Sequence, residues 1–185
     1  MRDAAKTGAR RVARAITRHI PGLSALSGRF GLGRFLAPTG TRERLRVDSD
    51  IVLELDLSIP IFRYMFFHYD PASIADLALV KALARPDLDF VDVGAQIGEI
   101  GLIGAKYSRH AYFFEPNRST FARLERNIAL NAVLGRKITA RSIAISAENG
   151  QRSLFTPASN PGVASFHALA EGAEEETVPT ETLDT

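Results

Sequence analysis

The segment that most constrains the fold is Asp89 to Gly98, which reads DFVDVGAQIG. A hydrophobic run ends on Asp92 and passes into a turn with glycines at 94 and 98, before an apolar helical pattern over residues 98–108. Glycine suits a turn in which a ligand approaches the backbone, because it has no Cβ and tolerates a positive φ. Such a turn delivers the ligand to the N-terminus of the next helix. The segment therefore predicts the first strand and turn of a nucleotide-binding unit.

The following sequence predicts that this unit continues as an α/β sheet. AYFFEPN at residues 111–117 is an unbroken apolar run of the buried parallel type, stopped by an acid and a proline. Asn117 is a candidate cap for a helix from Arg118 to about Leu134. A third strand is expected at Ile138–Ile145, and Asn149-Gly150 predicts a hairpin turn after it. Strands that alternate with helices indicate a parallel, Rossmann-like sheet.

The N-terminal quarter differs in composition from the rest. Residues 1–46 hold eleven Lys or Arg residues against two acids, although the whole chain has a net charge of only +2. We expect residues 1–45 to form a basic tail and linker, with a possible Ala/Arg-rich helix over the first twenty and many Gly and Pro residues after it. No large aliphatic or aromatic face accompanies the charges. A solvated tail is therefore favoured over a membrane-surface or nucleic-acid-binding helix.

A single folded domain over residues 46–185 is expected after this tail. Alternating apolar residues predict one or two strands over residues 46–62, and an Ala/Leu-rich pattern predicts a helix over residues 72–84. The intervening aromatic residues are interpreted as packing residues rather than a base-stacking platform; they are Tyr64, Phe66, Phe67 and Tyr69. Glutamates at 171 and 174–176 are interpreted as a solvated segment rather than a metal cluster, because consecutive side chains point in different directions.

Composition narrows the function classes. The chain has 185 residues, 45% of them hydrophobic, and no cysteine, so no disulfide or thiolate metal site is expected. The four histidines are scattered, and no metal site is predicted from them. No apolar run of 18 or more residues indicates a transmembrane helix, and the N-terminus lacks the apolar core of a secretory signal. We expect a soluble, cytoplasmic protein with no nucleic-acid partner.

Two acids indicate which nucleotide ligand suits the turn. Glu115 follows Gly94 by 21 residues, about the distance at which an acid meets the ribose hydroxyls in such a unit. Asp92 would repel a pyrophosphate but not an ammonium or sulfonium group. The glycines also lack the third member of the G-x-G-x-x-G dinucleotide fingerprint. Charge therefore favours S-adenosylmethionine over NAD, with Asp92 near the amino-acid or sulfonium end and Glu115 on the ribose.

These residues resemble the FkbM-type family of class I S-adenosylmethionine-dependent methyltransferases. The resemblance runs from about Asp56 to the last residue and rests on several motifs together. They are HYDP (68–71), VDVGAQIG (91–98), FFEPN (113–117), RLERNIALN (123–131), IAIS with ENG (143–150), a small-residue segment around Ser165, and the terminal ETLDT. The resemblance implies a class I methyltransferase sheet and methyl transfer to an oxygen nucleophile on a small molecule or sugar.

The resemblance also implies a set of cofactor-binding residues. The cofactor turn would consist of Asp92, Gly94, Gln96 and Gly98. Glu115 would bind the ribose with Asn117 beside it, and Ala144 would approach the adenine. Tyr69, next to Asp70, would lie on the cofactor side. The family usually has Asn where this chain has Gln96, so the turn geometry is expected to differ by a longer amide side chain. No residue is identified as the catalytic base, and His167 is expected to be a surface or loop histidine.

The resemblance also predicts that the sheet of this chain is incomplete. In the family a fourth strand follows a Thr-Leu-Asp like residues 182–184, so the sequence predicts a sheet truncated after the third strand plus a hairpin, with DFVDV at its edge. We expect such a chain to bind the cofactor weakly or not at all. The alternatives are a non-catalytic remnant or interaction module and, less favoured, an NAD-dependent oxidoreductase. Substrate and oligomeric state are not predicted.

Overall fold

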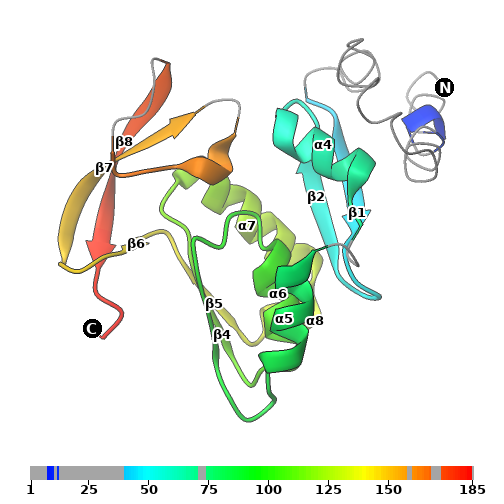
Figure 1. Ribbon diagram of the computed structural model, residues 1–185, viewed down its shortest axis with the longest axis horizontal. Coiled ribbons are helices and arrows are strands. Elements are labelled where there is room, and N and C mark those ends of the chain that lie inside the picture. The colour runs from blue at the N-terminus through cyan, green and yellow to red at the C-terminus, as the bar shows by residue number, and fades with distance from the viewer. Residues whose placement is uncertain are drawn as a thin grey trace. The chain divides into compact units, whose positions relative to one another are not determined.

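The computed structural model describes residues 8–10, 12, 40–70, 74–157, 160–167 and 172–184. The chain divides into two compact units (Figure 1). The first unit combines Met1–Leu45 with Leu55–Asp70, and the second combines Arg46–Glu54 with Pro71–Thr185. None of the described helices is long and apolar enough to cross a membrane.

A two-stranded sheet and one helix precede the predicted nucleotide-binding segment. The strands are β1 (Arg42–Arg46) and β2 (Val52–Asp56), and both alternate between buried and more exposed residues. The strand β1 begins inside the segment predicted as a linker. The helix α4 (Pro60–His68) was not predicted; it starts on a proline, whose fixed φ suits the first helical position. Its aromatic residues Phe66 and Phe67 are buried, which confirms their interpretation as packing residues, whereas Tyr64 is 62% exposed.

Arg10 differs from the prediction of a solvated tail. Its Nε donates a hydrogen bond of 2.6 Å to Oε1 of Glu43, and both side chains are buried. Arg10 is helical, as expected, but most of the predicted N-terminal helix lies outside the described residues. A buried ion pair is costly to break, because removal of one partner leaves an uncompensated charge.

The second unit contains the predicted parallel sheet. Its strands are β3 (Phe90–Val93), β4 (Ala111–Phe114) and β5 (Ile138–Arg141), in that order and all parallel. The crossover helices are α6 (Glu99–Tyr107) and α7 (Arg118–Leu130). The expected α/β fold with a parallel, Rossmann-like sheet is confirmed. Among the described strands β3 pairs with β4 alone, so it lies at the sheet edge as predicted.

One face of this sheet is open. Both crossovers run in the same direction along the sheet, so right-handed connections place α6 and α7 on the same face. On the other face Val91 and Val93 are 43% and 55% exposed, and Tyr112 of β4 is 36% exposed. The prediction that β4 is buried on both sides is therefore wrong. The strand reads as a continuous apolar run, but Tyr112 is exposed on this face, whereas Phe114 on the same face is buried.

Small residues allow α6 to lie close to the sheet. A Cβ on Gly101 would lie 2.7 Å from Oδ2 of Asp92 and 2.8 Å from the ring of Phe113. A Cβ on Gly104 would lie 2.5 Å from the ring of Phe90. Real Cβ atoms do not approach ring carbons this closely in a well-packed interior. The two glycines therefore set the distance between the helix and strands β3 and β4.

The helix predicted over Arg118–Leu134 is divided at Asn131. It forms α7 and a short α8 (Ala132–Gly135). Asn131 accepts a hydrogen bond of 3.0 Å from the Val52 N–H and donates one of 2.8 Å to the Val52 carbonyl. Asn127 accepts 2.8 Å from the Glu54 N–H. The two amides replace a neighbouring strand along this part of β2, which satisfies backbone groups that would be costly to leave unpaired.

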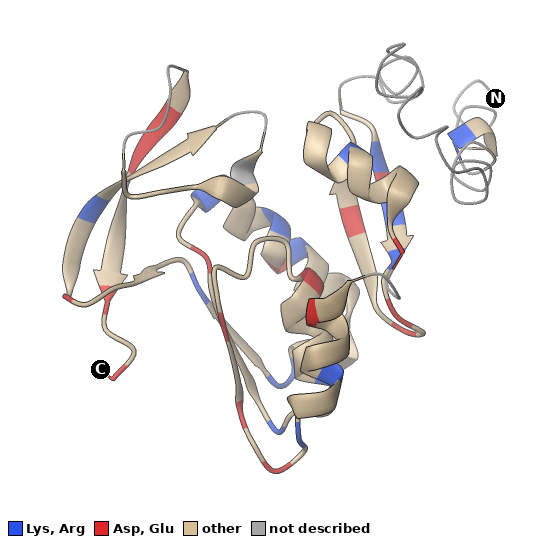
Figure 2. Ribbon diagram, viewed as in Figure 1, with Lys and Arg blue, Asp and Glu red and all other residues tan. Residues whose placement is uncertain are grey.

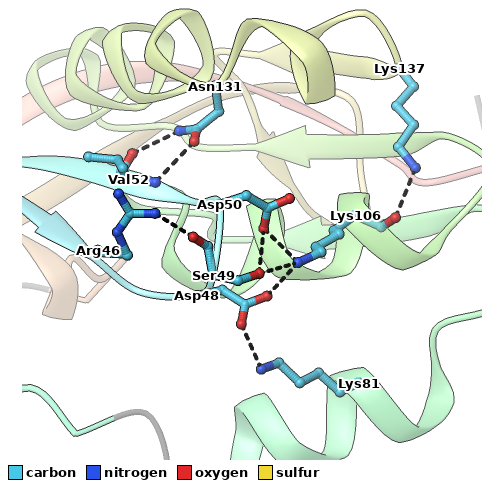
Figure 3. A network of polar contacts seen from close by, with 9 residues as sticks. All are labelled: Arg46, Asp48, Ser49, Asp50, Val52, Lys81, Lys106, Asn131 and Lys137. Carbon is cyan, nitrogen blue, oxygen red and sulfur yellow. Dashed lines mark hydrogen bonds and ion pairs between the residues drawn. The ribbon is translucent and has the colours of Figure 1, made fainter.

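A second set of polar contacts centres on Lys106 of α6 (Figure 3). Its Nζ donates to Asp50 at 2.6 Å, Asp48 at 2.9 Å and the hydroxyl of Ser49 at 3.0 Å. Lys81 of α5 (Ala75–Leu83) adds a contact of 3.2 Å to Asp48. The hydrogen bond from Lys106 lowers the pKa of Asp50 below its ordinary value. The network thus ties the turn between β1 and β2 to two helices of the second unit.

The segment after β5 differs from the prediction. Ile138–Ile145 is not one strand: β5 ends at Arg141, and β6 (Ala144–Ile145) belongs to another sheet with β8 (Ala173–Glu181) and β7 (Gly150–Pro157). The predicted hairpin across Asn149-Gly150 is also wrong, because β6 pairs with β8 in parallel and β7 pairs with β8 antiparallel. The hairpin is thus β7–β8, and its connection includes the short 3-10 helix η2 (Pro161–Val163).

Candidate functional site

The turn after β3 has the backbone geometry that its glycines predicted. Gly94 and Gly98 have φ values of 82° and 90°, in the region that favours glycine, and Gln96 between them has a φ of 49°. The N–H groups of Gly94 and Ala95 both donate to the Phe114 carbonyl, at 2.8 and 3.0 Å. Gly98 is the residue before the first turn of α6. The turn therefore leads into the N-terminus of α6, where backbone N–H groups and the positive end of the helix dipole can interact with a ligand.

Gly94 and Gly98 meet different surroundings. A Cβ on Gly98 would lie 2.9 Å from the Leu124 side chain, so this glycine is also needed for packing. A Cβ on Gly94 would meet no heavy atom of the described residues within 4 Å. Gly94 therefore borders open space, which is where a ligand would approach the backbone.

Glu115 lies directly against this turn. One carboxylate oxygen accepts from the Gln96 N–H at 2.9 Å and the other from the Asn117 N–H at 2.9 Å. Burial raises the pKa of Glu115 above its ordinary value; these two backbone donors act against the rise, and the charges of Asp92 and Glu176 add to it. A carboxylate has about four acceptor positions, so two remain for donors such as a ribose diol.

Asp92 points toward α6, beside Gly101. Desolvation by burial raises the pKa of its carboxyl to about 6. A desolvated carboxyl with a raised pKa is typical of a functional site. Because the charges of Asp92 and Glu176 raise the pKa of Glu115, a cation that entered the site would favour the charged form of Glu115.

A small apolar hollow of about 170 Å³ opens beside Gly94 at the carboxyl ends of the strands. Its lining includes Ala144 and Ile143 on one side, Phe114 and Pro116 on another, and residues 164–166 from the connection between β7 and β8. Whole small-molecule sites usually measure roughly 300 to 1,000 Å³. The hollow therefore suits one ring system of a ligand rather than an entire cofactor, and Ala144, the residue predicted to approach the adenine, is part of its lining.

The side-chain amide of Gln96 has a partner in the connection between β7 and β8. Its Nε2 donates a hydrogen bond of 3.1 Å to the carbonyl of Gly162 in η2. A Cβ on Gly162 would lie 2.4 Å from the same nitrogen atom. This hydrogen bond thus joins the turn to the β7–β8 connection, which also lines the hollow.

Asn127 is a site residue that sequence reasoning missed. Its side chain is fully buried and donates 2.8 Å to the carbonyl of Ile97, inside the turn. Asn127 therefore connects α7 to the turn through its amide nitrogen, while its amide oxygen accepts a hydrogen bond from the backbone of β2. Asn127 lies in the motif RLERNIALN (123–131), but no role was predicted for this residue.

Seven of the eight predicted site residues lie in the second unit around this turn: Asp92, Gly94, Gln96, Gly98, Glu115, Asn117 and Ala144. Tyr69 belongs to the first unit, where it is buried after α4, and its cofactor role stays a prediction. His167 is exposed, as expected. Among the described residues no group of three or more His, Asp or Glu side chains is arranged to hold a metal ion.

No model of a protein family matches this chain. No curated protein matches it either. Three solved structures are similar to part of it. A Pyrococcus horikoshii protein designated a transferase shares 26% identity over 56% of this chain and 37% of its own, with a TM-score of 0.45. P. horikoshii TYW2 in complex with MeSAdo shares 24% identity over 59% of this chain and 38% of its own, with a TM-score of 0.47.

M. jannaschii TYW2 in complex with AdoMet shares 20% identity over 54% of this chain and 42% of its own, with a TM-score of 0.43. The chain therefore spans about two fifths of the length of these structures.

Proposed function

We propose that the second unit binds S-adenosylmethionine at the turn between β3 and α6. The observation that carries this proposal is the position of Glu115, whose buried carboxylate is fixed by the N–H groups of Gln96 and Asn117 directly beside the open face of Gly94. A carboxylate held in this way is suited to accept both hydroxyls of an adenosine ribose. In this proposal the adenine occupies the hollow beside Ala144.

Charge supports this cofactor over a dinucleotide. Asp92, Glu115 and Glu176 are close enough for the charges of the first and third to raise the pKa of Glu115. A pyrophosphate would add negative charge to this group of carboxylates, whereas the sulfonium and ammonium groups of S-adenosylmethionine would offset it. Asp92 is proposed to lie nearest the amino-acid or sulfonium end, and Gly94, Gln96 and Gly98 to shape the turn.

The finer proposal is methyl transfer to an oxygen nucleophile on a small molecule or sugar, as the resemblance to FkbM-type methyltransferases implies. In such a displacement the protein mainly holds the methyl carbon close to the nucleophile and in line with it. The chemistry that the cofactor supplies is the activated methyl group. This chain would bind the adenosine of the cofactor through Glu115 and Ala144 and place Asn117 beside the ribose.

The test is ligand titration of the whole chain, followed by NMR so that weak binding is measured. S-adenosylmethionine and S-adenosylhomocysteine are expected to shift the amide signals of residues 94–98 and 115–117, and NAD is expected not to. The affinity is expected to be weaker than micromolar, because the turn lies at the edge of the sheet.

Glycine variants provide a matched control. Gly94→Ala and the control Gly172→Ala both place a side chain at a positive φ, with no heavy atom of the described residues within 4 Å of the added Cβ, at a cost of roughly 1 to 2 kcal/mol in stability. Gly94→Ala additionally places a methyl group where the ligand approaches, so it should abolish binding while the protein remains folded. Binding of NAD in preference to the sulfonium ligand, or unchanged binding by Gly94→Ala, would contradict the proposal.

A further inference from the structure

The β7–β8 hairpin contributes an acid to the same region. The strand β8 carries three consecutive glutamates, visible as the long red stretch of that strand in Figure 2. Glu174 and Glu175 are exposed, but Glu176 is half-buried, opposite the buried Leu154 of β7. The prediction that all of these glutamates form a solvated segment is therefore wrong for Glu176.

Glu176 contacts Asn117, the last residue of the FFEPN motif. The Asn117 Nδ2 donates to Glu176 Oε1 at 2.6 Å and to Thr156 Oγ1 at 3.1 Å. The Asn117 Oδ1 accepts from the Thr120 N–H and from the Ser119 hydroxyl, both at 2.8 Å. A carboxylate can only accept and a backbone N–H can only donate, so these partners determine the orientation of the amide. All the polar atoms of this side chain are thus engaged.

The backbone of Asn117 continues this chain of contacts to the proposed ribose acid. Its N–H donates to Glu115 Oε1 at 2.9 Å, while the Gln96 N–H holds Oε2. Rotation of the Asn117 side chain would remove the cap of α7 and disturb the peptide that holds Glu115. The hairpin therefore reaches the cofactor turn through one asparagine.

We propose that Glu176 is a positioning residue of the cofactor site: it fixes Asn117, which in turn holds the Glu115 carboxylate in the orientation that a ribose diol requires. This inference rests on the proposed function. The hydrogen bond from Asn117 ends on a charged group, which makes it stronger than a neutral one. Loss of this hydrogen bond should therefore weaken the binding of the ribose hydroxyls to Glu115 and leave the binding of the rest of the ligand unchanged.

The experiment compares adenosine with 2′,3′-dideoxyadenosine, which differ by the two ribose hydroxyls alone. Wild-type protein is expected to prefer adenosine. Glu176→Ala should weaken adenosine binding by about 5- to 20-fold, the range of one charge-assisted hydrogen bond, and leave dideoxyadenosine binding unchanged. Glu176→Gln, which keeps an acceptor oxygen for Asn117, should retain most of the preference. Glu175→Ala, on the other face of the same strand, is the matched control.

An equal loss of both ligands in Glu176→Ala, or no loss, would overturn the inference. A second readout needs no ligand. Hydrogen exchange of the Gln96, Asn117 and Thr120 amides should be faster in Glu176→Ala than in Glu175→Ala, because these N–H groups bond to Glu115 and Asn117. Should wild-type protein bind neither nucleoside, the proposed function fails and this exchange difference decides the inference: faster exchange supports it and equal exchange overturns it.

Discussion

The carboxylate of Asp92 lies directly against Gly101 of α6, so that a Cβ at position 101 would be 2.7 Å from Oδ2. A helix with any larger residue there would have to move away from β3. The close approach removes water from the carboxyl group, and this desolvation raises its pKa to about 6. Helix packing and the chemistry of the turn are thus coupled through a glycine.

Because of this desolvation, the charged form of Asp92 destabilises the folded protein at neutral pH. A carboxyl whose pKa is higher in the folded than in the unfolded state favours folding fully below its unfolded pKa, and this contribution is lost as the pH rises through the folded value. With a pKa of about 6 against 3.8, the loss between pH 4 and 7 is roughly 1 to 3 kcal/mol at about 1.4 kcal/mol per unit. Asp92→Asn should therefore stabilise the protein by this amount at pH 7.5 and have little effect at pH 3, below the unfolded pKa.

Urea unfolding at the two pH values measures this effect. Glu175→Gln, which neutralises an exposed carboxylate on β8, serves as the control and should change stability little at either pH. If Asp92→Asn destabilised the protein at pH 7.5, the carboxylate would have to make a stabilising interaction that outweighs its desolvation.

Ligand binding should release protons. In the free protein, burial raises the pKa of both Asp92 and Glu115. A cationic ligand favours the charged forms and lowers these pKa values, so affinity should increase as the pH rises from about 5 to 7. S-adenosylmethionine should release more protons than S-adenosylhomocysteine, because only the former carries a sulfonium charge.

Calorimetry in buffers with different ionisation enthalpies counts the released protons. Asp92→Asn is expected to reduce the count and to weaken binding of the sulfonium ligand more than binding of the thioether. Proton uptake on binding, or equal counts for the two ligands, would contradict the placement of a cation beside Asp92.

The glycine at position 104 should be required for packing rather than for flexibility. A methyl group there would lie 2.5 Å from the Phe90 ring. Although alanine is the better helix former by about 1 kcal/mol, overpacking should make Gly104→Ala destabilising by roughly 1 to 3 kcal/mol. Gly150→Ala, whose Cβ would lie an ordinary 3.8 Å from Thr180, is the control. Phe90→Leu in the Gly104→Ala background should restore part of the loss, and a stabilising Gly104→Ala would show that the ring moves freely.

The sequence predicted the βαβ core well, because its signals are local. The glycine turn at 94–98, the acid at 115 and the cap at 117 are each determined by neighbours a few residues away, and the structure brings them together as expected. The open face of β4 was not predictable, because the apolar run around Tyr112 has the same composition whether one or two faces are covered.

The remaining site residues depend on contacts between distant segments. Glu176 meets Asn117 from 59 residues away, and Asn127 meets the Ile97 carbonyl from 30 residues away. No local pattern indicates which of three consecutive glutamates turns inward. The division between β5 and β6 has the same origin, because Ala144 and Ile145 pair with Thr180 and Glu181 rather than with the neighbouring parallel sheet.

The network around Lys106 should fail in acid and upon loss of its cation. The hydrogen bond from Lys106 lowers the pKa of Asp50, so the contribution of this carboxylate is present above its ordinary pKa and is lost as the pH falls through the lower folded value. Lys106→Met should destabilise the protein at pH 7 by about 1 to 2 kcal/mol, because it leaves Asp48 and Asp50 close together without their shared donor.

Lys81→Met is the matched control, since Lys81 is more exposed and makes one contact of 3.2 Å with Asp48; its effect should be smaller. Between pH 5 and 3, wild-type protein should lose more stability than Lys106→Met, because the variant has already lost the interaction that protonation removes. Urea unfolding across this range measures both slopes. Parallel slopes for the two proteins would mean that the acid sensitivity originates elsewhere, and that the contacts in Figure 3 position the turn between β1 and β2 without stabilising it.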